Sequence, residues 1–340
     1  MFDSNMAETK VVLYGIGVIG GKMAEAILEK KGMKIVGAID IDPNKVGKDL
    51  GDVLGKKRTG VKVSSDVDGV LASTRPDIVV HTTSSYLKDT YAQFDGILRH
   101  GVNIVSTCEE LSYPYVTEEG KVLGDKLDKL AKEKKATILG TGINPGFLMD
   151  ALPIVLTGPC LRVDGITITR QMNAATRRVP FQKKIGAGLT VADFRKKIDG
   201  HEITGHVGLE QSIGMIAGAL GWKLDEIKVE QVIPVIAEKP VKSEAINVAK
   251  GNCAGLKQMA KGLIGSKAVI TLDFRAYIGA EEEFDSVVVE GVPPIRQKIS
   301  PCVHGDYGTI GMTVNSIPKV IASDPGLKTM KDLPFPSATP

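Results

Sequence analysis

Short apolar runs alternate with amphipathic stretches over the first 145 residues of the chain. The runs are rich in β-branched residues and predict strands at 10–14, 34–40, 61–63, 77–82, 103–107 and 137–140. The stretches at 20–30, 89–100 and 116–135 repeat apolar residues at helical spacing. Strands that alternate with helices in this way predict βαβ units and a parallel, doubly wound sheet, which is an α/β fold.

The pattern changes after residue 145. Residues 165–172, 268–278 and 284–290 alternate apolar and polar side chains and predict long strands, while 190–198 and 207–220 predict helices. We expect a second, α+β domain at 146–305 with a mixed or antiparallel sheet. A last helical pattern at 306–322 is expected to return to the first domain, which would then comprise 1–145 and 306–340.

Composition narrows the class of protein. With 340 residues, 43% hydrophobic, 24% charged and a net charge of +3, the chain is typical of a two-domain globular protein and not of a nucleic-acid or membrane-surface binder. No apolar run is long enough to span a bilayer, and residues 1–5 lack the order of a signal peptide. The four cysteines are far apart, so we expect neither a metal site nor disulfides and place the protein in the cytoplasm.

A glycine motif follows the first predicted strand directly. Gly15, Gly17 and Gly20, with Val18 and Ile19 between them, form GxGxxG and open a predicted helix. The first glycine permits a tight turn, the second lets a pyrophosphate approach the backbone, and the third allows close helix–strand packing. The helix N-terminus offers N–H groups to the phosphates. In this context the motif predicts a Rossmann dinucleotide site rather than a structural turn.

Asp40 ends the second predicted strand, 20 residues after the last glycine of the motif. A carboxylate there accepts hydrogen bonds from the adenosine ribose hydroxyls and repels a 2′-phosphate. We therefore predict NAD or NADP as cofactor and favour NAD, although nearby Lys45 would soften the repulsion.

Other polar residues follow later strands. Thr82, Thr83 and Ser84 come after the strand at 77–82, and Asn144 comes after the strand at 137–140. The carboxyl ends of parallel strands face the ligand crevice, so these side chains are candidates for cofactor contacts. A helix-capping loop and a plain turn explain them equally well.

Glu109 and Glu110 stand just past the strand at 103–107. An acid beside the nicotinamide suits a dehydrogenase that acts on an amine, because a carboxylate can accept the ammonium proton, stabilise an iminium cation and activate water. We favour Glu109 as the base, with Glu110 the alternative. Both residues could instead cap the segment that follows.

A second chemistry competes for the same segment. Cys108 suggests the thiol nucleophile of a semialdehyde dehydrogenase, but no base is adjacent, and a small buried cysteine is the better interpretation. Substrate contacts are expected from the second domain. The candidates are Arg170 as a carboxylate clamp, Asn173 beside it, and His206 in a glycine-flanked loop, each with a structural alternative.

These motifs resemble those of a known family. The strings 14–20, 40–43 and 81–84 resemble the dihydrodipicolinate reductase superfamily, and 106–114 with 144–147 resemble 2,4-diaminopentanoate dehydrogenase and the related native amine dehydrogenases. The resemblance implies NAD(P)-dependent deamination of 2,4-diaminopentanoate to 2-amino-4-oxopentanoate and ammonia, as in ornithine fermentation. It also implies a homodimer or larger assembly built through the second domain, and a catalytic glutamate within the pair Glu109 and Glu110.

Two alternatives remain open. Another dehydrogenase of the superfamily could act on meso-diaminopimelate or on simple amines, and the arginines at 170, 177 and 178 would suit a substrate with two carboxylates. The second alternative is a non-catalytic protein that binds and senses NAD without turnover. It predicts that Glu109 and Glu110 are dispensable.

Overall fold

The computed structural model describes residues 8–338, and within them the chain divides into two compact units. The first unit runs to Phe147 and resumes at Gly305, and the second spans Leu148–His304. The expectation about a signal peptide concerns residues 1–5, which lie outside the described residues.

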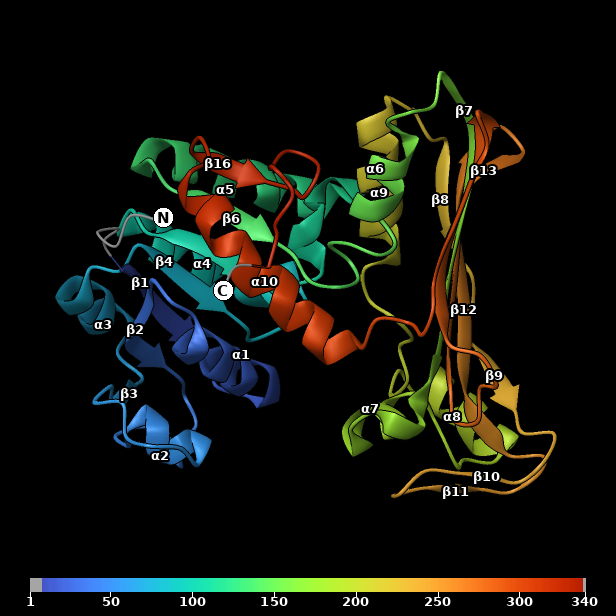
Figure 1. The fold of residues 1–340 in the computed structure, drawn as a ribbon, viewed down its shortest axis with the longest axis horizontal. Coiled ribbons are helices and arrows are strands. Elements are labelled where there is room, and N and C mark those ends of the chain that lie inside the picture. Colours follow the sequence, from blue (N-terminus) through green and yellow to red (C-terminus); the bar gives the residue numbers. More distant parts are fainter. Residues whose placement is uncertain (1–7, 339–340) are drawn as a thin grey trace. The chain divides into compact units, whose positions relative to one another are not determined.

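The first unit alternates strands and helices along the chain (Figure 1). Its elements are β1 (Thr9–Tyr14), α1 (Val18–Glu29), β2 (Met33–Ile39), α2 (Leu50–Leu54), β3 (Val63–Ser64), α3 (Val67–Thr74), β4 (Ile78–His81), α4 (Leu87–Arg99), β5 (Asn103–Ser106), α5 (Glu118–Lys134), β6 (Thr137–Gly140), α10 (Gly305–Ile321) and β16 (Gly326–Lys328).

Among the described residues, seven parallel strands form the sheet of this unit in the order β16-β6-β5-β4-β1-β2-β3. The stretch β3-β2-β1-β4-β5-β6 is the Rossmann strand order, which reverses between β1 and β4. The predicted α/β fold with a doubly wound sheet is confirmed. Because ligands bind at the carboxyl ends of the strands beside such a reversal, the loops after β1 and β4 are the place to look for a site.

Apolar residues on both faces of this sheet are covered by helices. Val12, Val79 and Ile104 pack with α3, α4 and α5 in one buried cluster. Helices α1 and α10 contact each other and cover the other face (Figure 1). Burial on both faces explains why the strands are continuous apolar runs without alternation.

The second unit is built on one long sheet. Its elements are α6 (Ala151–Thr157), β7 (Arg162–Asn173), α7 (Val179–Lys184), α8 (Val191–Asp199), α9 (Leu209–Leu220), β8 (Glu226–Val229), β9 (Ile233–Ile236), β10 (Val241–Lys242), β11 (Asn247–Val248), β12 (Cys253–Ile264), β13 (Lys267–Tyr277), β14 (Phe284–Val292) and β15 (Ile295–Ile299). The strand order is β15-β14-β7-β13-β12-β8, with β9 also on β12. Only β7 and β13 pair in parallel among these strands of the described residues, so the expected mixed sheet is confirmed.

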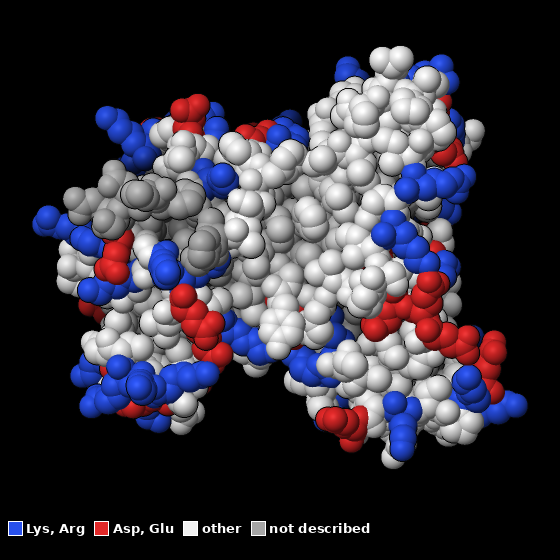
Figure 2. Space-filling model, viewed as in Figure 1, with Lys and Arg blue, Asp and Glu red and all other residues white. Residues whose placement is uncertain are grey.

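Charged side chains are distributed over both units. Figure 2 shows basic and acidic residues interspersed on the surface of each. None of the helices within residues 8–338 combines the length and the apolar character that crossing a membrane requires.

Candidate cofactor and catalytic site

The glycine loop between β1 and α1 has the conformation that a dinucleotide requires. Gly15 has φ +94°, and a Cβ there would lie 2.8 Å from the carbonyl oxygen of Thr82. A Cβ on Gly20 would lie 2.0 Å from the carbonyl oxygen of Gly15, so neither position accepts a side chain without movement. Around Gly17, by contrast, nothing lies within 4 Å of a built Cβ. The loop is closed on the protein side and open where a pyrophosphate would approach.

Helix α1 begins beside this open space. Gly17 is its N-cap and supplies no side-chain hydrogen bond, and the first turn, with the exposed Val18, contains no acidic residue. The first N–H groups, including those of Val18 and Ile19, and the positive end of the helix dipole are therefore available to an anion. These residues fit the phosphates of NAD, whose contact with them stays a prediction.

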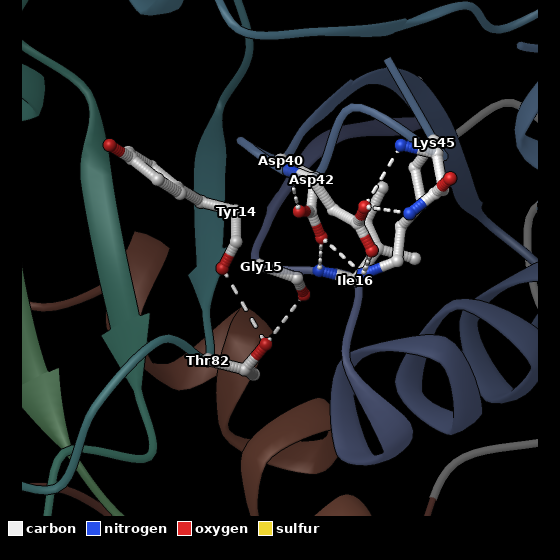
Figure 3. Close-up of polar contacts among 8 residues, drawn as sticks. Tyr14, Gly15, Ile16, Asp40, Asp42, Lys45 and Thr82 are labelled. Carbon is white, nitrogen blue, oxygen red and sulfur yellow. Dashed lines mark hydrogen bonds and ion pairs between the residues drawn. The ribbon is translucent and has the colours of Figure 1, made fainter.

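Asp40 follows β2 and reaches the glycine loop (Figure 3). Its carboxylate accepts hydrogen bonds from the backbone N–H of Ile16 at 2.7 Å, the N–H of Asp42 at 2.9 Å and Lys45 Nζ at 3.0 Å. Burial raises the pKa of Asp40, but the two backbone donors and Lys45 outweigh burial and hold the pKa below its usual value. Asp40 is therefore ionised and both anchors the loop and presents negative charge beside it.

Lys45 does not give the region around Asp40 a net positive charge. Its Nζ also lies 3.4 Å from Asp42 Oδ2, so one ammonium serves two carboxylates. The group Asp40, Asp42 and Lys45 carries a net charge of −1 if all three are ionised. This balance opposes a 2′-phosphate and is compatible with a free ribose hydroxyl.

The hydroxyls after β4 are engaged within the first unit. Thr82 Oγ1 donates to the carbonyl oxygen of Gly15 at 2.7 Å, Thr83 Oγ1 donates to Gln93 Oε1 at 2.7 Å, and Ser84 Oγ donates to Asp89 Oδ2 at 3.2 Å. Thr82 thus stabilises the glycine loop through the carbonyl group of Gly15. A direct contact of these three residues with the cofactor stays a prediction.

The two glutamates after β5 have different surroundings. Glu110 Oε2 accepts a hydrogen bond from the backbone N–H of Leu87 at 2.7 Å, at the start of α4, where the N-cap Tyr86 supplies no side-chain bond. Glu110 therefore caps α4, an earlier helix, and not the segment that follows it, which was the structural alternative for this pair. Glu109 is half-buried, and its carbonyl oxygen accepts from Ser112 Oγ at 2.7 Å. The role of Glu109 as the base stays a prediction.

Cys108 is unsuited to nucleophilic chemistry. Its side chain is buried, and its Sγ donates to the carbonyl oxygen of Ser85 at 3.3 Å. Burial, with the negative charges of Glu109 and Glu110 adding to it, raises the pKa of Cys108 to about 12. A thiol with this pKa is almost entirely protonated near neutral pH, which removes the semialdehyde dehydrogenase reading.

His81, the first residue of the string 81–84, is a fully buried polar residue at the end of β4. Burial lowers the pKa of His81 to about 4, so its imidazole is neutral at physiological pH. Asn144 lies beyond β6 in a loop with a cis Asn144–Pro145 peptide bond. The neighbouring Ile143 N–H donates to Thr309 Oγ1 of α10 at 3.3 Å, and the predicted cofactor contact of Asn144 stays a prediction.

The candidate substrate residues lie in the second unit. For Arg170 the structure contradicts the predicted role. Its guanidinium is 2% exposed and pairs with Asp285 at 2.5 Å, while Nη2 donates to the carbonyl oxygen of Val303 at 2.7 Å. The prediction of a carboxylate clamp is wrong because Arg170 lies on the buried side of β7, where its guanidinium is already paired. A buried guanidinium already paired in this way is a structural group.

Asn173 and His206 are also held by neighbours. Asn173 Oδ1 accepts from the N–H groups of Ala175 and Gly279 at 3.0 and 3.1 Å. The His206 ring stacks on Phe274 with centroids 4.5 Å apart. Asn173 therefore ties the end of β7 to the loop after β13. His206 is half-buried, and its substrate contact stays a prediction.

Comparison with known proteins gives the family. Residues 147–340 match the model of the 2,4-diaminopentanoate dehydrogenase C-terminal domain, and residues 9–109 match the dihydrodipicolinate reductase N-terminus. A 2,4-diaminopentanoate dehydrogenase from Acetoanaerobium sticklandii is 35% identical over 98% of this chain and 95% of its own. An amine dehydrogenase from Streptomyces virginiae is 24% identical over 95% of this chain and 96% of its own.

Solved structures agree. An amine dehydrogenase from Mycobacterium smegmatis matches with a TM-score of 0.83 and 31% identity over 98% of both chains. The WlbA dehydrogenase from Bordetella pertussis, solved with NADH and UDP-GlcNAcA, matches with a TM-score of 0.52 and 14% identity over 92% of this chain and 88% of its own, which shows a shared fold alone. The resemblance found in the sequence is confirmed, and the chain belongs to the 2,4-diaminopentanoate dehydrogenase family.

Proposed function

We propose that this protein is an NAD(P)-dependent dehydrogenase that converts 2,4-diaminopentanoate to 2-amino-4-oxopentanoate and ammonia. The observation that carries the proposal is the half-buried Glu109, directly after β5, in a chain that is 35% identical to a 2,4-diaminopentanoate dehydrogenase over nearly its full length. Glu109 and the glycine loop both follow carboxyl ends of strands in one parallel sheet, so they share the edge at which ligands bind.

Glu109 has three tasks in this reaction. It accepts a proton from the substrate ammonium, so that the nitrogen lone pair can form a double bond to carbon as the hydrogen on that carbon leaves with its electron pair. A bound nicotinamide would supply the acceptor for that hydride. Glu109 passes the ammonium proton to solvent, and its restored carboxylate then stabilises the iminium cation and takes a proton from the water that adds to the carbon. That proton returns to the nitrogen as it leaves. Loss of ammonia leaves the ketone, and two electrons have passed to the cofactor.

NAD is the proposed preferred cofactor. Asp40 is ionised and already holds the loop, and its partner Lys45 is shared with Asp42. A 2′-phosphate would enter a corner with a net negative charge, whereas ribose hydroxyls can still donate to the carboxylate. NADP use at lower affinity is compatible with Lys45 being nearby.

Two other substrates test the assignment. meso-Diaminopimelate has a second carboxylate that needs a cation, and the buried Asp285 pair removes Arg170 from that role. Simple amines remain a specific second candidate, because relatives of this chain carry the name amine dehydrogenase. A protein that only senses NAD is the outcome if no amine is turned over while NADH still binds.

We further propose a cytoplasmic homodimer built through the second unit. The helices of this unit contact the sheet on one side (Figure 1). On that side Ile168 and Leu272 are fully buried, while the neighbouring Thr167 is exposed on the opposite side. A second copy of the chain would cover the uncovered side. Sedimentation of a species heavier than the 36.2 kDa chain supports this, and a monomer at micromolar concentration rejects it.

The test of function is the formation of reduced nicotinamide from a panel of amines. The panel contains 2,4-diaminopentanoate, ornithine, meso-diaminopimelate and simple alkyl amines, each with NAD and with NADP, and ammonia release is measured in parallel. We expect 2,4-diaminopentanoate to give the highest kcat/KM. Faster turnover of simple amines would assign the broader amine dehydrogenase activity instead.

A further inference from the structure

His81 lies where two loops of the site begin. It is the last residue of β4, is 0% exposed, and packs its ring against Tyr14 and Phe94 with centroids 5.4 and 4.6 Å apart. Its Nδ1 lies 2.9 Å from Ser106 Oγ, at the end of β5. Its Nε2 lies 2.6 Å from Gln93 Oε1 of α4 and 3.0 Å from Thr83 Oγ1.

The partners fix the tautomer of the ring. Gln93 Oε1 can only accept, so His81 Nε2 carries the proton and donates it. Nδ1 then has a lone pair and accepts from the hydroxyl of Ser106. Ser106 Oγ in turn accepts from the backbone N–H of Cys108 at 3.1 Å. The burial that lowers the pKa of His81 to about 4 keeps the ring in this neutral form.

The two nitrogens therefore serve different segments. The Nε2 side reaches α4 and the loop after β4, whereas the Nδ1 side reaches Cys108 through Ser106 and so fixes the residue before Glu109. A second bond supports the same segment, because the N–H of Thr107 donates to the carbonyl oxygen of His81 at 3.1 Å. Groups that react must be held to within about 0.5 Å by such supporting bonds.

We propose that His81 is a positioning residue for Glu109, acting through Nδ1, Ser106 Oγ and the backbone of Cys108. The inference rests on the proposed function, since it takes Glu109 as the base. It assigns His81 no contact with substrate and no proton transfer. The directed chain of hydrogen bonds keeps the segment after β5 in one conformation, and breaking it should slow the chemical step while cofactor binding is unchanged.

Isosteric variants separate the two nitrogens. The amide of Asn in His81→Asn reaches the Nδ1 position and can accept from Ser106, while the amide of Gln in His81→Gln reaches the Nε2 position and can donate to Gln93. Ser106→Ala removes the link to Cys108 with the smallest change of volume. His100→Gln is the matched control, because His100 lies at the surface of the same unit and pairs with Asp68 at 2.8 Å.

The readouts are kcat, KM for both substrates, and NADH affinity by fluorescence titration. We expect kcat to fall roughly tenfold or more in Ser106→Ala and His81→Gln, with NADH affinity within about twofold, and His81→Asn to keep most of kcat. His100→Gln should match the wild type. Equal losses in His81→Asn and His81→Gln, or a wild-type kcat in Ser106→Ala, would overturn the proposal.

Hydrogen exchange covers the case in which a His81 variant fails to fold. In Ser106→Ala the peptide spanning 107–112 should exchange faster while the strands stay protected, and unchanged exchange there would overturn the proposal. Failure of the proposed function has a different signature. If Glu109→Gln keeps full turnover the base is misassigned, whereas loss in Glu109→Gln with full activity in Ser106→Ala rejects only the positioning role.

Discussion

Glu110 Oε2 lies 2.7 Å from the backbone nitrogen of Leu87 and accepts its hydrogen bond at the start of α4. This bond separates two adjacent acids that are alike in the sequence. The carboxylate of Glu110 satisfies an N–H that the helix leaves unpaired, whereas the proposed function takes Glu109 as the base. The assignment of roles therefore depends on a contact between residues 23 positions apart.

Glu110→Ala is expected to act on stability. Loss of a cap and of a negative charge at a helix N-terminus costs about 1 kcal/mol of the free energy of unfolding. Urea unfolding measures the change. Glu118→Ala serves as a comparison of charge alone, because Glu118 lies in the first turn of α5 and the side-chain cap of that helix comes from Thr117. A stability equal to the wild type would contradict the capping role.

Two glycines of the loop should respond in opposite ways to alanine. Gly20→Ala places a Cβ 2.0 Å from the carbonyl oxygen of Gly15 and should lower the free energy of unfolding by about 1–3 kcal/mol. Gly17→Ala meets nothing within 4 Å, so stability should hold while NADH affinity falls about tenfold or more, because the methyl group occupies the pyrophosphate side. Thermal unfolding and fluorescence titration distinguish the two. Full NADH affinity in Gly17→Ala would show that the phosphates of the cofactor do not bind at this loop.

Arg170 should behave as a structural residue. Arg170→Met leaves Asp285 buried without its partner and is expected to cost about 3–5 kcal/mol of the free energy of unfolding. The double variant Arg170→Met with Asp285→Leu should recover most of this loss, since an apolar pair replaces the ions. Denaturant unfolding of the single and double variants measures the coupling. A stable Arg170→Met with a raised KM for the diamine would restore the substrate role.

Acid should destabilise the protein through His81. The pKa of His81 is about 4 in the folded protein and about 6.5 when exposed, so between these values the unfolded chain binds a proton that the folded one does not. Stability is fully present above pH 6.5 and falls by up to about 3 kcal/mol as the pH falls toward 4. His81→Gln cannot take up this proton. Denaturant midpoints across this range should fall less steeply in that variant, and equal slopes would place the acid sensitivity elsewhere.

Cofactor choice should depend on the charges around Lys45. We expect the wild type to bind NADH at least about tenfold more tightly than NADPH, because Asp40 and Asp42 share one ammonium. Asp42→Asn should narrow this ratio, since the pair that remains is neutral. Asp52→Asn makes the same change of charge on α2 without touching Lys45 and is the control. An unchanged ratio in Asp42→Asn would exclude Asp42 from discrimination.

Local patterns predicted most of the first unit. The strands at 103–106 and 137–140 are continuous apolar runs bounded by helical stretches, and a strand buried on both faces leaves that signal in the sequence. The glycine motif was predictable for a similar reason, because its spacing encodes backbone conformation and close approach.

One long strand of the second unit was not predicted from the sequence. β12 was missed because its buried positions include Ala260 and Gly262, which give little hydrophobic alternation. The small residue is required: a Cβ on Gly262 would lie 2.9 Å from side chains of Ile213 and Leu224. Arg170 was misread because its partner Asp285 lies 115 residues away. No role was predicted for His81, because its hydrogen-bond partners lie on separate elements that only the fold brings together.

The most direct test of the account is a comparison of Glu109→Gln with Glu110→Gln in the oxidation of 2,4-diaminopentanoate, measured as reduced nicotinamide and as ammonia. The account predicts that Glu109→Gln binds NADH like the wild type and loses about 100-fold or more in kcat, while Glu110→Gln keeps kcat within a few fold. Full turnover by Glu109→Gln, or loss confined to Glu110→Gln, would contradict it.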